Sequence, residues 1–460
     1  MGERFDASFR HEKWSSGSVF VLATIGAAVG LGNLWRFPFI AGQNGGAAFV
    51  LVYFGFVLLF GVPIMMAELT LGRRGKGSAI ATMQKLVREA GASRMWQAIG
   101  WLSIVIPLVG LSYYSVVAGW SIDYVFKAGA NAFAGFSGSD SEEAFNELLA
   151  SPWRNLILHA AFIGSAVFIV ARGISGGIEI VAKYMMPGLF IILVILVVNS
   201  IFNADIVRGL DFLLNPDFSK LTPDVVFMAL GQAFFSLAIG VGVMVTYGAY
   251  VPPDVSLPKA ALTIAIADTA VAILAGFAIF PVVFANGLDP ADGPGLIFVT
   301  LPVAFGNMQA GYIVGLLFFI LLFFAAFSSV IGMLEPVVSY LEEHRGFSRP
   351  RMTVLTGMFG WLTGIVAVLS FNVWSDVRLA TFIPLLAEKS IFDLIDFFIA
   401  NLLLPLNAML IAAFAGWVMS WDLTLRELGL QNKAVITYLR VILRYVAPLG
   451  IGAIFYTNLG

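Results

Sequence analysis

The 460-residue chain contains no cysteine and few charged residues, and each absence excludes a class of function. Without a thiol the chain holds no disulfide, no thiolate metal site and no cysteine nucleophile. Charged residues make up 12% of the chain, about half of what a soluble protein carries. The basic residues are scattered rather than arranged in a stripe with aromatics, so no nucleic-acid interface is expected. Hydrophobic residues make up 59%, which indicates a membrane protein.

Long apolar runs recur along the whole chain. A run of about 20 apolar residues is enough to cross about 30 Å of hydrocarbon. The eleven runs lie at about 17–38, 44–70, 97–126, 153–171, 178–202, 225–251, 259–286, 311–342, 352–371, 391–417 and 437–459. They predict an all-α membrane protein with eleven transmembrane helices. The first run lacks a small-residue cleavage site, so a cleavable signal peptide is not expected.

The loops differ in positive charge, and this difference predicts the orientation. With the N-terminus inside, nineteen lysines and arginines fall on the inner side and six on the outer side. Because cytoplasmic loops carry the excess of positive charge, the N-terminus is predicted to be cytoplasmic. After eleven spans the C-terminus is then outside. The chain is expected in the cell membrane as a multi-pass protein in contact with the lipid bilayer.

Two of the runs are poorly suited to a continuous helix. The first contains Gly26-Ala-Ala-Val-Gly-Leu-Gly-Asn-Leu-Trp-Arg-Phe-Pro38, and the sixth contains Gly231-Gln-Ala-Phe-Phe-Ser-Leu-Ala-Ile-Gly-Val-Gly242. Interrupted segments at matching positions of two halves are typical of a transporter site built on an inverted repeat. The two runs lie five spans apart, so the halves are upside down to each other. We therefore predict a tail at 1–14 and one transmembrane domain at 15–460, with repeats at about 15–202 and 225–417 and an extra helix at about 437–459.

Several runs carry polar or charged side chains near their centre, where charges are costly and mark functional sites. Four runs bring a polar residue close to mid-membrane: Asn33, Ser236, Asp268, and the pair Ser328 and Ser329. Further charged residues within the runs are Arg36, Glu68, Glu335, Asp393 and Asp396. Oxygen ligands without histidine or cysteine favour a hard cation such as Na⁺. An interrupted helix adds free N–H groups and a positive dipole end, which favour an anion such as a carboxylate.

Each of these features has a simpler explanation when it stands alone. Gly26-x-x-x-Gly30 matches a helix-packing motif, and Ser328-Ser329 would more often bond back to its own helix. Gly30-x-Gly32 follows no strand, so it is no dinucleotide-binding fingerprint. Their occurrence at one depth, together with a second interrupted helix, favours a binding site over packing.

The motifs together resemble the signature of the neurotransmitter:sodium symporter family. They cover nearly the whole chain: 26–38, Asn44-Gly-Gly-Ala-Ala-Phe49, Pro63-x-x-x-x-Glu68, Tyr113-Tyr114, Arg172-Gly-Ile-Ser-x-Gly-Ile-Glu179 and Gly231-Gln-x-Phe-Phe-Ser236. The resemblance implies the broken-helix, 5+5 inverted-repeat fold of the bacterial leucine transporter, called the LeuT-type fold. Eleven spans are similar to a bacterial subset of the family that lacks the last helix.

The resemblance implies two sodium sites. The ligands of the first are the Ala28 carbonyl, Asn33, Ser236 and Asp268, completed by the substrate carboxylate. The ligands of the second are the carbonyls of Gly26, Val29 and Ala325 and the hydroxyls of Ser328 and Ser329. Family members commonly have asparagine where Asp268 stands, and glutamate or serine where this chain has Ala272. Because the Asp268 carboxylate balances the sodium charge, we expect two Na⁺ ions and no chloride.

The resemblance also implies a substrate site between spans 1, 3, 6 and 8. The expected residues are Ala27, Ala28, Leu31, Gly32, Gly110, Tyr114, Phe235, Ser236, Ala238, Val241, Ser329 and Met333. Position 30 is glycine, where monoamine-carrying relatives have an aspartate, which favours a zwitterionic α-amino acid. Gly110 and Val241 are smaller than their counterparts in the leucine transporter, which favours a larger apolar or aromatic side chain. Each methylene discriminates by only about 1–3 kcal/mol, so the specificity is expected to be broad.

Two gates follow from the same resemblance. Arg36 and Asp396 are expected to pair on the outer side, above the substrate. On the inner side Trp14 and Tyr250 are expected to close the exit, with Glu343 as the anion. The family arginine at this gate aligns with His11, next to Arg10; a histidine in this role would make the gate depend on pH. Glu68 is expected to bond the free N–H groups of the interrupted sixth span.

These features predict a sodium-coupled secondary active symporter of neutral hydrophobic L-amino acids that works by alternating access, and not an enzyme. No nucleophile–base pair is visible, and no obligate protein partner is evident. A channel would need a continuous polar pore, whereas the polar residues gather at one depth. Proton coupling through Asp268 stays open and would give sodium-independent uptake with a pH optimum. A non-transporting amino-acid sensor on the same fold also stays open, and only a flux measurement would separate it.

Overall fold

The computed structural model describes residues 12–291 and 295–459, and within these ranges the chain is helical, without β-strands. In this part of the chain nine helices are long and apolar enough to cross a membrane. The first four are Ala47–Gly75 (α3, Ala47–Phe56, and α4, Val62–Gly75), Arg94–Gly129 (mostly α6, Ala98–Gly129), Pro152–Val170 (α8) and Ile174–Asn203 (mostly α9, Glu179–Asn203). The next three are Leu257–Ala285 (α13), Gly311–His344 (within α15, Gly311–Arg345) and Arg349–Leu369 (α16). The last two are Ile391–Val418 (including α17, Ile391–Phe397, and α18, Leu404–Ala413) and Lys433–Ala453 (α20, Lys433–Val441, and α21, Ala447–Leu459). These confirm the expected all-α membrane architecture.

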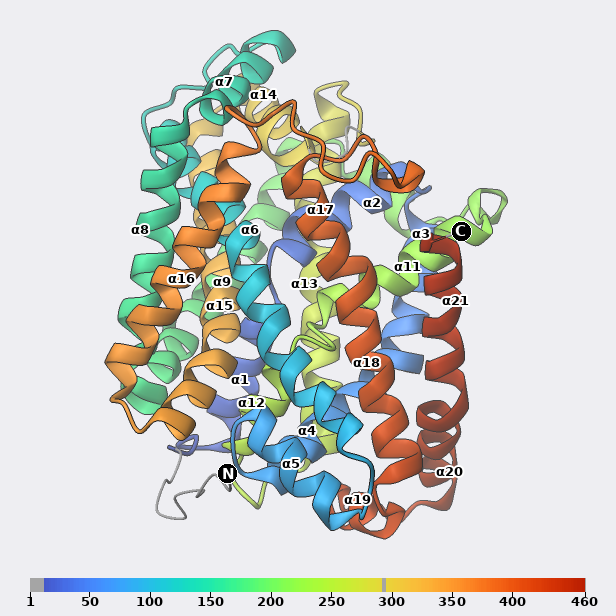
Figure 1. Ribbon diagram of the computed structural model, residues 1–460. Coiled ribbons are helices and arrows are strands. Elements are labelled where there is room, and N and C mark those ends of the chain that lie inside the picture. The colour runs from blue at the N-terminus through green and yellow to red at the C-terminus, as the bar shows by residue number, and fades with distance from the viewer. Residues whose placement is uncertain (1–11, 292–294, 460) are drawn as a thin grey trace.

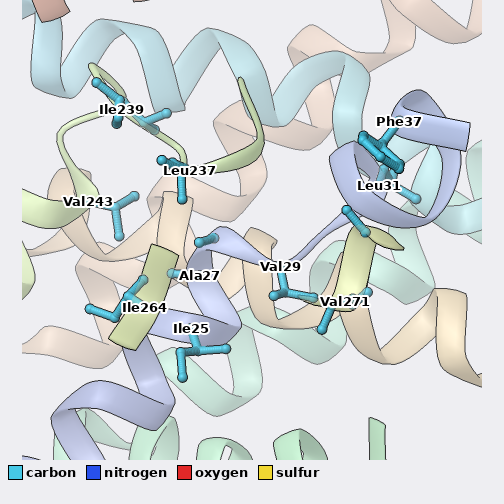
Figure 2. Packing of buried hydrophobic residues seen from close by; sticks show 14 of the residues in the cluster. Ile25, Ala27, Val29, Leu31, Phe37, Leu237, Ile239, Val243, Ile264 and Val271 are labelled. Carbon is cyan, nitrogen blue, oxygen red and sulfur yellow. The ribbon is translucent and has the colours of Figure 1, made fainter. Parts of the chain in front are cut away.

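The first expected span is broken. α1 (Gly17–Ala28) is followed by a non-helical link and then by a second helical piece, Gly32–Gln43, which ends in α2 (Phe37–Gln43). The two pieces are bent by 52°. Figure 2 shows the thin link beside Val29, between Ala27 on the first piece and Leu31 on the second. The break exposes backbone N–H and C=O groups that a continuous helix would satisfy internally.

Glycine at position 30 is required by the close approach of two other spans. A Cβ atom there would lie 2.5 Å from the Ser329 hydroxyl and 2.6 Å from the Tyr114 hydroxyl. Ser329 belongs to α15 and Tyr114 to α6, so the link is held between these two helices. The glycines of the first run therefore do more than pack helices, because they let two hydroxyl groups reach the bare backbone.

The sixth expected span is also interrupted. α11 (Pro223–Ser236) and α12 (Val243–Ala249) are separated by residues 237–242. Ala238, Gly240 and Gly242 have positive φ values of 51°, 81° and 96°, which end one helix and redirect the chain. The nine spans named above and the bent first span together make up to ten membrane spans in the described part of the chain. Counting α11 and α12 as one broken span would give eleven, and that count stays a prediction.

The two interruptions lie inside a ring of long helices. α1 packs against α9, α13 and α15, and α12 packs against α4. In Figure 1, α8 and α16 form one side of the molecule and α21 the other. α5 (Ala79–Glu89) and α19 (Trp421–Leu428) lie at the bottom of this view. α7 (Gly138–Ala150) and α14 (Leu301–Asn307) lie at the top, and the C-terminal end is in the upper half on the right.

Aromatic side chains pack the helical turn Leu296–Thr300 against α6. Phe298, just before α14, lies 5.6 Å from Trp120 and 5.0 Å from Tyr124, ring centre to ring centre. The Tyr124 hydroxyl donates to the Phe298 carbonyl at 2.8 Å. A short connection, α10 (Ile206–Leu214), packs beside α13. These contacts fix the outer ends of α6 and α15, which frame the site described below.

Replacing Gly242 by alanine tests the interruption of the sixth span. A Cβ atom at Gly242 would lie 2.4 Å from the Ser103 side chain, and its φ of 96° disfavours any other residue. We expect Gly242→Ala to lower the free energy of unfolding by about 2–4 kcal/mol. Gly231→Ala is the matched control, because nothing lies within 4 Å of that position. Thermal unfolding in detergent measures both, and equal melting temperatures would contradict the account.

Candidate functional site

The two interruptions face one central cavity of about 60 Å³. Nine of the expected substrate residues form its wall: Ala27, Ala28, Gly32, Tyr114, Phe235, Ala238, Val241, Ser329 and Met333. Gly110 lies directly behind Met333, since a Cβ atom there would be 2.5 Å from the Met333 methyl carbon. Leu31 and Ser236 are outside the wall and take part in the polar contacts beside it. The cavity therefore gathers residues from spans 1, 3, 6 and 8.

A fifth helix contributes to this wall, and the sequence did not indicate it. Ile399 and Leu404, from the middle of the Ile391–Val418 span, line the cavity, as does Ile106 of α6. These are apolar side chains within apolar runs, so no pattern distinguishes them from residues that face lipid. Their presence makes the side of the cavity away from α1 almost wholly apolar.

A cluster of four fully buried polar side chains lies next to the cavity. The Asn33 amide nitrogen donates to the Ser236 hydroxyl at 2.9 Å and to an Asp268 carboxylate oxygen at 2.9 Å. The Ser236 hydroxyl donates to the other Asp268 oxygen at 2.6 Å. The Tyr53 hydroxyl donates to Ser236 at 3.1 Å. Sequence reasoning grouped the first three residues but missed Tyr53, a lone tyrosine in the middle of the second run.

The donor set of this cluster fits a hard cation. In the described part of the chain no salt bridge involves Asp268, whose carboxylate is completely buried. A buried charge without a partner is costly, so a cation beside Asp268 and the Ser236 hydroxyl would stabilise it. The Asn33 amide oxygen accepts from the Gly30 N–H at 3.0 Å.

The second expected sodium set lies where α1 approaches α15. The Ser329 hydroxyl donates to the Val29 carbonyl at 3.2 Å, across the two helices. The Ser328 hydroxyl donates to carbonyls of its own helix, at 3.0 Å to Ala325. A Cβ atom on Gly26 would lie 3.3 Å from the Ser328 side chain, so the two helices are in close contact. The Ser328 hydroxyl is thus hydrogen-bonded to its own helix, and its role as a sodium ligand stays a prediction.

The bare backbone of the first broken span is held by neighbouring side chains. The Leu31 N–H donates to the Tyr114 hydroxyl at 3.0 Å. The Gly32 carbonyl accepts from the Gln232 amide at 2.8 Å. Gly32 and Tyr114 line the cavity, so both contacts lie at its wall. The tyrosine hydroxyl therefore gives this part of the wall a polar group beside the bare backbone.

The interruption of the sixth span is supported from its far side by two buried residues. Glu68 of α4 accepts from the Gly240 N–H at 2.7 Å. Asn407 of α18 donates to the Gly240 carbonyl at 2.7 Å. Glu68 was expected at this position, whereas the sequence analysis gave no role to Asn407, although it is a polar residue within the run 391–417. That Glu68 is needed for transport stays a prediction.

On the outer side the cavity opens into a larger vestibule of about 300 Å³. Arg36 and Asp396 both line it, with the Arg36 guanidinium 4.4 Å above the centre of the Phe235 ring. No salt bridge joins Arg36 to Asp396 among the described residues. Both residues of the expected outer gate therefore line the vestibule without being paired, and their pairing in another state of the protein stays a prediction.

On the inner side the path is closed. Trp14 is 3% exposed, and its indole N–H donates to the Tyr247 carbonyl at 3.1 Å. The Trp14 backbone N–H donates to the Tyr250 carbonyl at 3.2 Å. His11 and Arg10 lie outside the described residues. Trp14, before α1, is therefore buried, whereas Arg36, on the other half of the same broken span, lines the vestibule.

Tyr250, expected at the inner gate, contacts an anion to which the sequence gave no role. The Tyr250 hydroxyl donates to Glu335 at 3.0 Å, and Glu335 is paired with Arg349. Glu343, the expected anion, accepts from the Ser78 N–H at 2.9 Å, and its role at the gate stays a prediction. Glu335 stood out in the sequence as a charge within a run, but its partner Arg349 lies beyond the loop and so gave no signal.

Comparison with known proteins agrees with this geometry. The sequence profile of the sodium:neurotransmitter symporter family matches residues 11–138 and 152–459. The chain belongs to this family. A sodium-dependent transporter of Bacillus subtilis is 36% identical over 451 residues, 97% of this chain and 98% of the relative. One of Haemophilus influenzae is 34% identical over 461 residues, 98% of each chain.

A solved structure supports the same assignment. The crystal structure of MhsT in complex with L-phenylalanine has a TM-score of 0.89 and 39% sequence identity, over 97% of this chain and 100% of that chain. The family resemblance and the LeuT-type fold are thereby confirmed. The symporter described here is a sodium-dependent membrane transporter of this family.

The buried pair at the inner gate of this symporter can be tested by removing one charge. Glu335 is completely buried and the Arg349 side chain is 13% exposed. Arg349→Met leaves Glu335 without its cation, and we expect the free energy of unfolding to fall by about 3–5 kcal/mol. The double variant Glu335→Gln, Arg349→Met should recover part of the loss. Arg351→Met, at an exposed position of α16, is the control in thermal unfolding, and an equal effect there would refute the role.

Proposed function

We propose that the protein couples the movement of Na⁺ down its gradient to the uptake of neutral hydrophobic L-amino acids, by alternating access. One observation carries the proposal: the buried Asp268 carboxylate, which forms no salt bridge within the described residues, lies beside a cavity whose wall combines polar groups with apolar side chains. An α-amino acid has the same combination. Its carboxylate would contact the Leu31 N–H and the cation, and its side chain would enter the apolar part.

The apolar wall supports a large or aromatic side chain. Ile106, Val241, Ile399 and Leu404 line it, and Gly110 lets the Met333 side chain pack closely against α6. A polar side chain would lose its hydrogen bonds to water there without replacement, which is costly. The similar protein MhsT was crystallised with L-phenylalanine, which agrees with this choice. Specificity is expected to be broad, because apolar walls discriminate weakly between apolar side chains.

Two sodium ions and no chloride are proposed for the transport cycle. The first would bind at Ala28, Asn33, Ser236 and Asp268, and the second between Gly26, Val29, Ala325, Ser328 and Ser329. Ala272, one helical turn after Asp268, is completely buried and has no polar atom for an anion. The Asp268 carboxylate supplies the negative charge that chloride would otherwise bring.

The orientation and the repeats belong to the same proposal. The N-terminus is placed in the cytoplasm and the C-terminus outside, in the cell membrane, on the excess of positive charge in one set of loops. The repeats at about 15–202 and 225–417 are proposed to be inverted copies, each beginning with a broken span. Rocking of one part against the other would then open the cavity alternately to the two sides.

Uptake into proteoliposomes tests the function. With an inward Na⁺ gradient, we expect concentrative uptake of Trp, Tyr, Phe or Leu that stops when choline replaces Na⁺. Gluconate in place of chloride should leave uptake unchanged. Uptake that does not depend on Na⁺ but is driven by a pH gradient would show that the coupling ion is the proton and not Na⁺. Na⁺-dependent binding without flux would identify a sensor.

Substituting Asp268 tests the charge balance. We expect Asp268→Asn to reduce chloride-free uptake by about tenfold or more, because the sodium charge loses its buried counter-ion. The double variant Asp268→Asn, Ala272→Ser should regain uptake when chloride is present. Ala272→Ser alone is the matched control and should transport equally with and without chloride. A double variant that ignores chloride would contradict the explanation.

A further inference from the structure

The described N-terminal segment (residues 12–16) and the start of the fifth span hold each other by two carboxylates. Glu12 accepts from the Ile174 N–H at 2.6 Å and from the Ser175 N–H at 3.2 Å. In the opposite direction, Glu179 accepts from the Ser15 N–H at 2.6 Å and from the Ser15 hydroxyl at 2.8 Å. Each segment thus supplies a carboxylate to donors of the other.

The fifth span depends on this outside partner, because its own sequence does not cap it. The residue before the first turn is Gly173, with φ of 88°, and no side chain at that position caps the turn Ile174–Ile178. The first N–H groups of a helix have no partner within it, and a carboxylate there is favoured by the helix dipole. A Cβ atom on Gly173 would lie 2.8 Å from the Glu12 carboxylate. Glycine therefore leaves the space that Glu12 needs.

Trp14 lies between the two contacts along the chain. Glu12 precedes it by two residues and Ser15 follows it directly, so both sides of the gate residue are fixed to one helix end. Glu179 is 1% exposed, and its remaining charged contact is Lys183, 3.3 Å away. Glu12 is exposed to solvent. The buried carboxylate thus loses most if the N-terminal segment leaves.

We propose that Glu12 and Glu179 form a reciprocal clasp that keeps Trp14 in place and sets how readily the inner gate opens. The proposal rests on the alternating-access function given above. Both glutamates are positioning residues, since they act through Trp14 and contact no substrate. When the segment withdraws, Glu179 loses two donors and the Ile174 and Ser175 N–H groups lose their acceptor. The clasp therefore favours the state that is closed on the inside.

The absence of cysteine makes a direct test possible in the full-length protein. Ala182 of α9 is 5% exposed and lines a small cavity with Gly26, Tyr247 and Ser328, behind the clasp. Ala182→Cys should react slowly with a membrane-impermeant thiol reagent added from the cytoplasmic side. On this background we expect Glu179→Gln, and separately Glu12→Gln, to raise the labelling rate by about tenfold or more, because each removes charge-assisted hydrogen bonds.

Two further variants distinguish a clasp from a general weakening of the fold. Glu142→Gln, on an exposed part of α7, is the control and should leave the rate unchanged. The double variant Glu12→Gln, Glu179→Gln should label no faster than the quicker single variant, because one clasp is broken only once. Additive effects, or unchanged labelling in both single variants, would overturn the proposal.

The labelling readout is independent of the proposed transport. If uptake does not depend on Na⁺ while the Glu12 and Glu179 variants still raise the labelling rate, the proposed clasp is supported and the proposed coupling to Na⁺ is wrong. If Glu179→Gln fails to fold, the solvent-exposed Glu12→Gln still gives the rate. Melting temperatures are measured alongside, and labelling is carried out far below the transition, where global unfolding does not expose the cysteine.

Discussion

The structure depends on satisfying bare backbone in the middle of a membrane. Where a helix is interrupted there, each free N–H or C=O group must find a partner within the protein, because hydrocarbon supplies none. The partners here are side chains from other helices: Tyr114 for Leu31, Gln232 for Gly32, and Glu68 with Asn407 for Gly240. These bonds hold the interrupted segments open toward the cavity. Figure 2 shows how closely apolar residues surround the same two breaks.

Much of this arrangement was predictable from the sequence, because polar residues and glycines are rare within apolar runs and so stand out. Polar residues and glycines within the apolar runs indicated the broken first span and the position of Glu68. They also indicated the group of Asn33, Ser236 and Asp268. The family resemblance then gave roles to residues that chemistry alone leaves open, such as Tyr114.

What the sequence did not indicate has a physical reason. Ile399 and Leu404 line the cavity, but an apolar residue that faces a cavity looks the same as one that faces lipid or a neighbouring helix. Asn407 and Tyr53 each contact the site across a long separation in sequence. The pairing of Tyr250 with Glu335, and of Glu335 with Arg349, is set by how three helices converge at the inner end. Such contacts depend on tertiary packing, which local sequence patterns do not predict.

The two ends of the cavity are held by different kinds of interaction. At the end predicted to face outward, Arg36 and Asp396 line the vestibule, and no salt bridge joins them in the described part of the chain. The inner end is sealed by the buried Trp14 and by hydrogen bonds to carbonyls and carboxylates. Opening it means breaking a set of buried contacts together. Under the proposed alternating access, ion and substrate binding at the centre would supply the free energy for that change, through tighter contacts in one state than in the other.

The central claim is that the cation beside Asp268 and the amino-acid carboxylate bind as one unit. The most direct measurement is the equilibrium dissociation constant of L-phenylalanine for the detergent-solubilised protein over a series of Na⁺ concentrations at constant ionic strength. The account predicts that the constant rises by about tenfold or more when choline replaces Na⁺, and by linkage that L-phenylalanine tightens Na⁺ binding by the same factor. A dissociation constant that does not change with Na⁺ would contradict it.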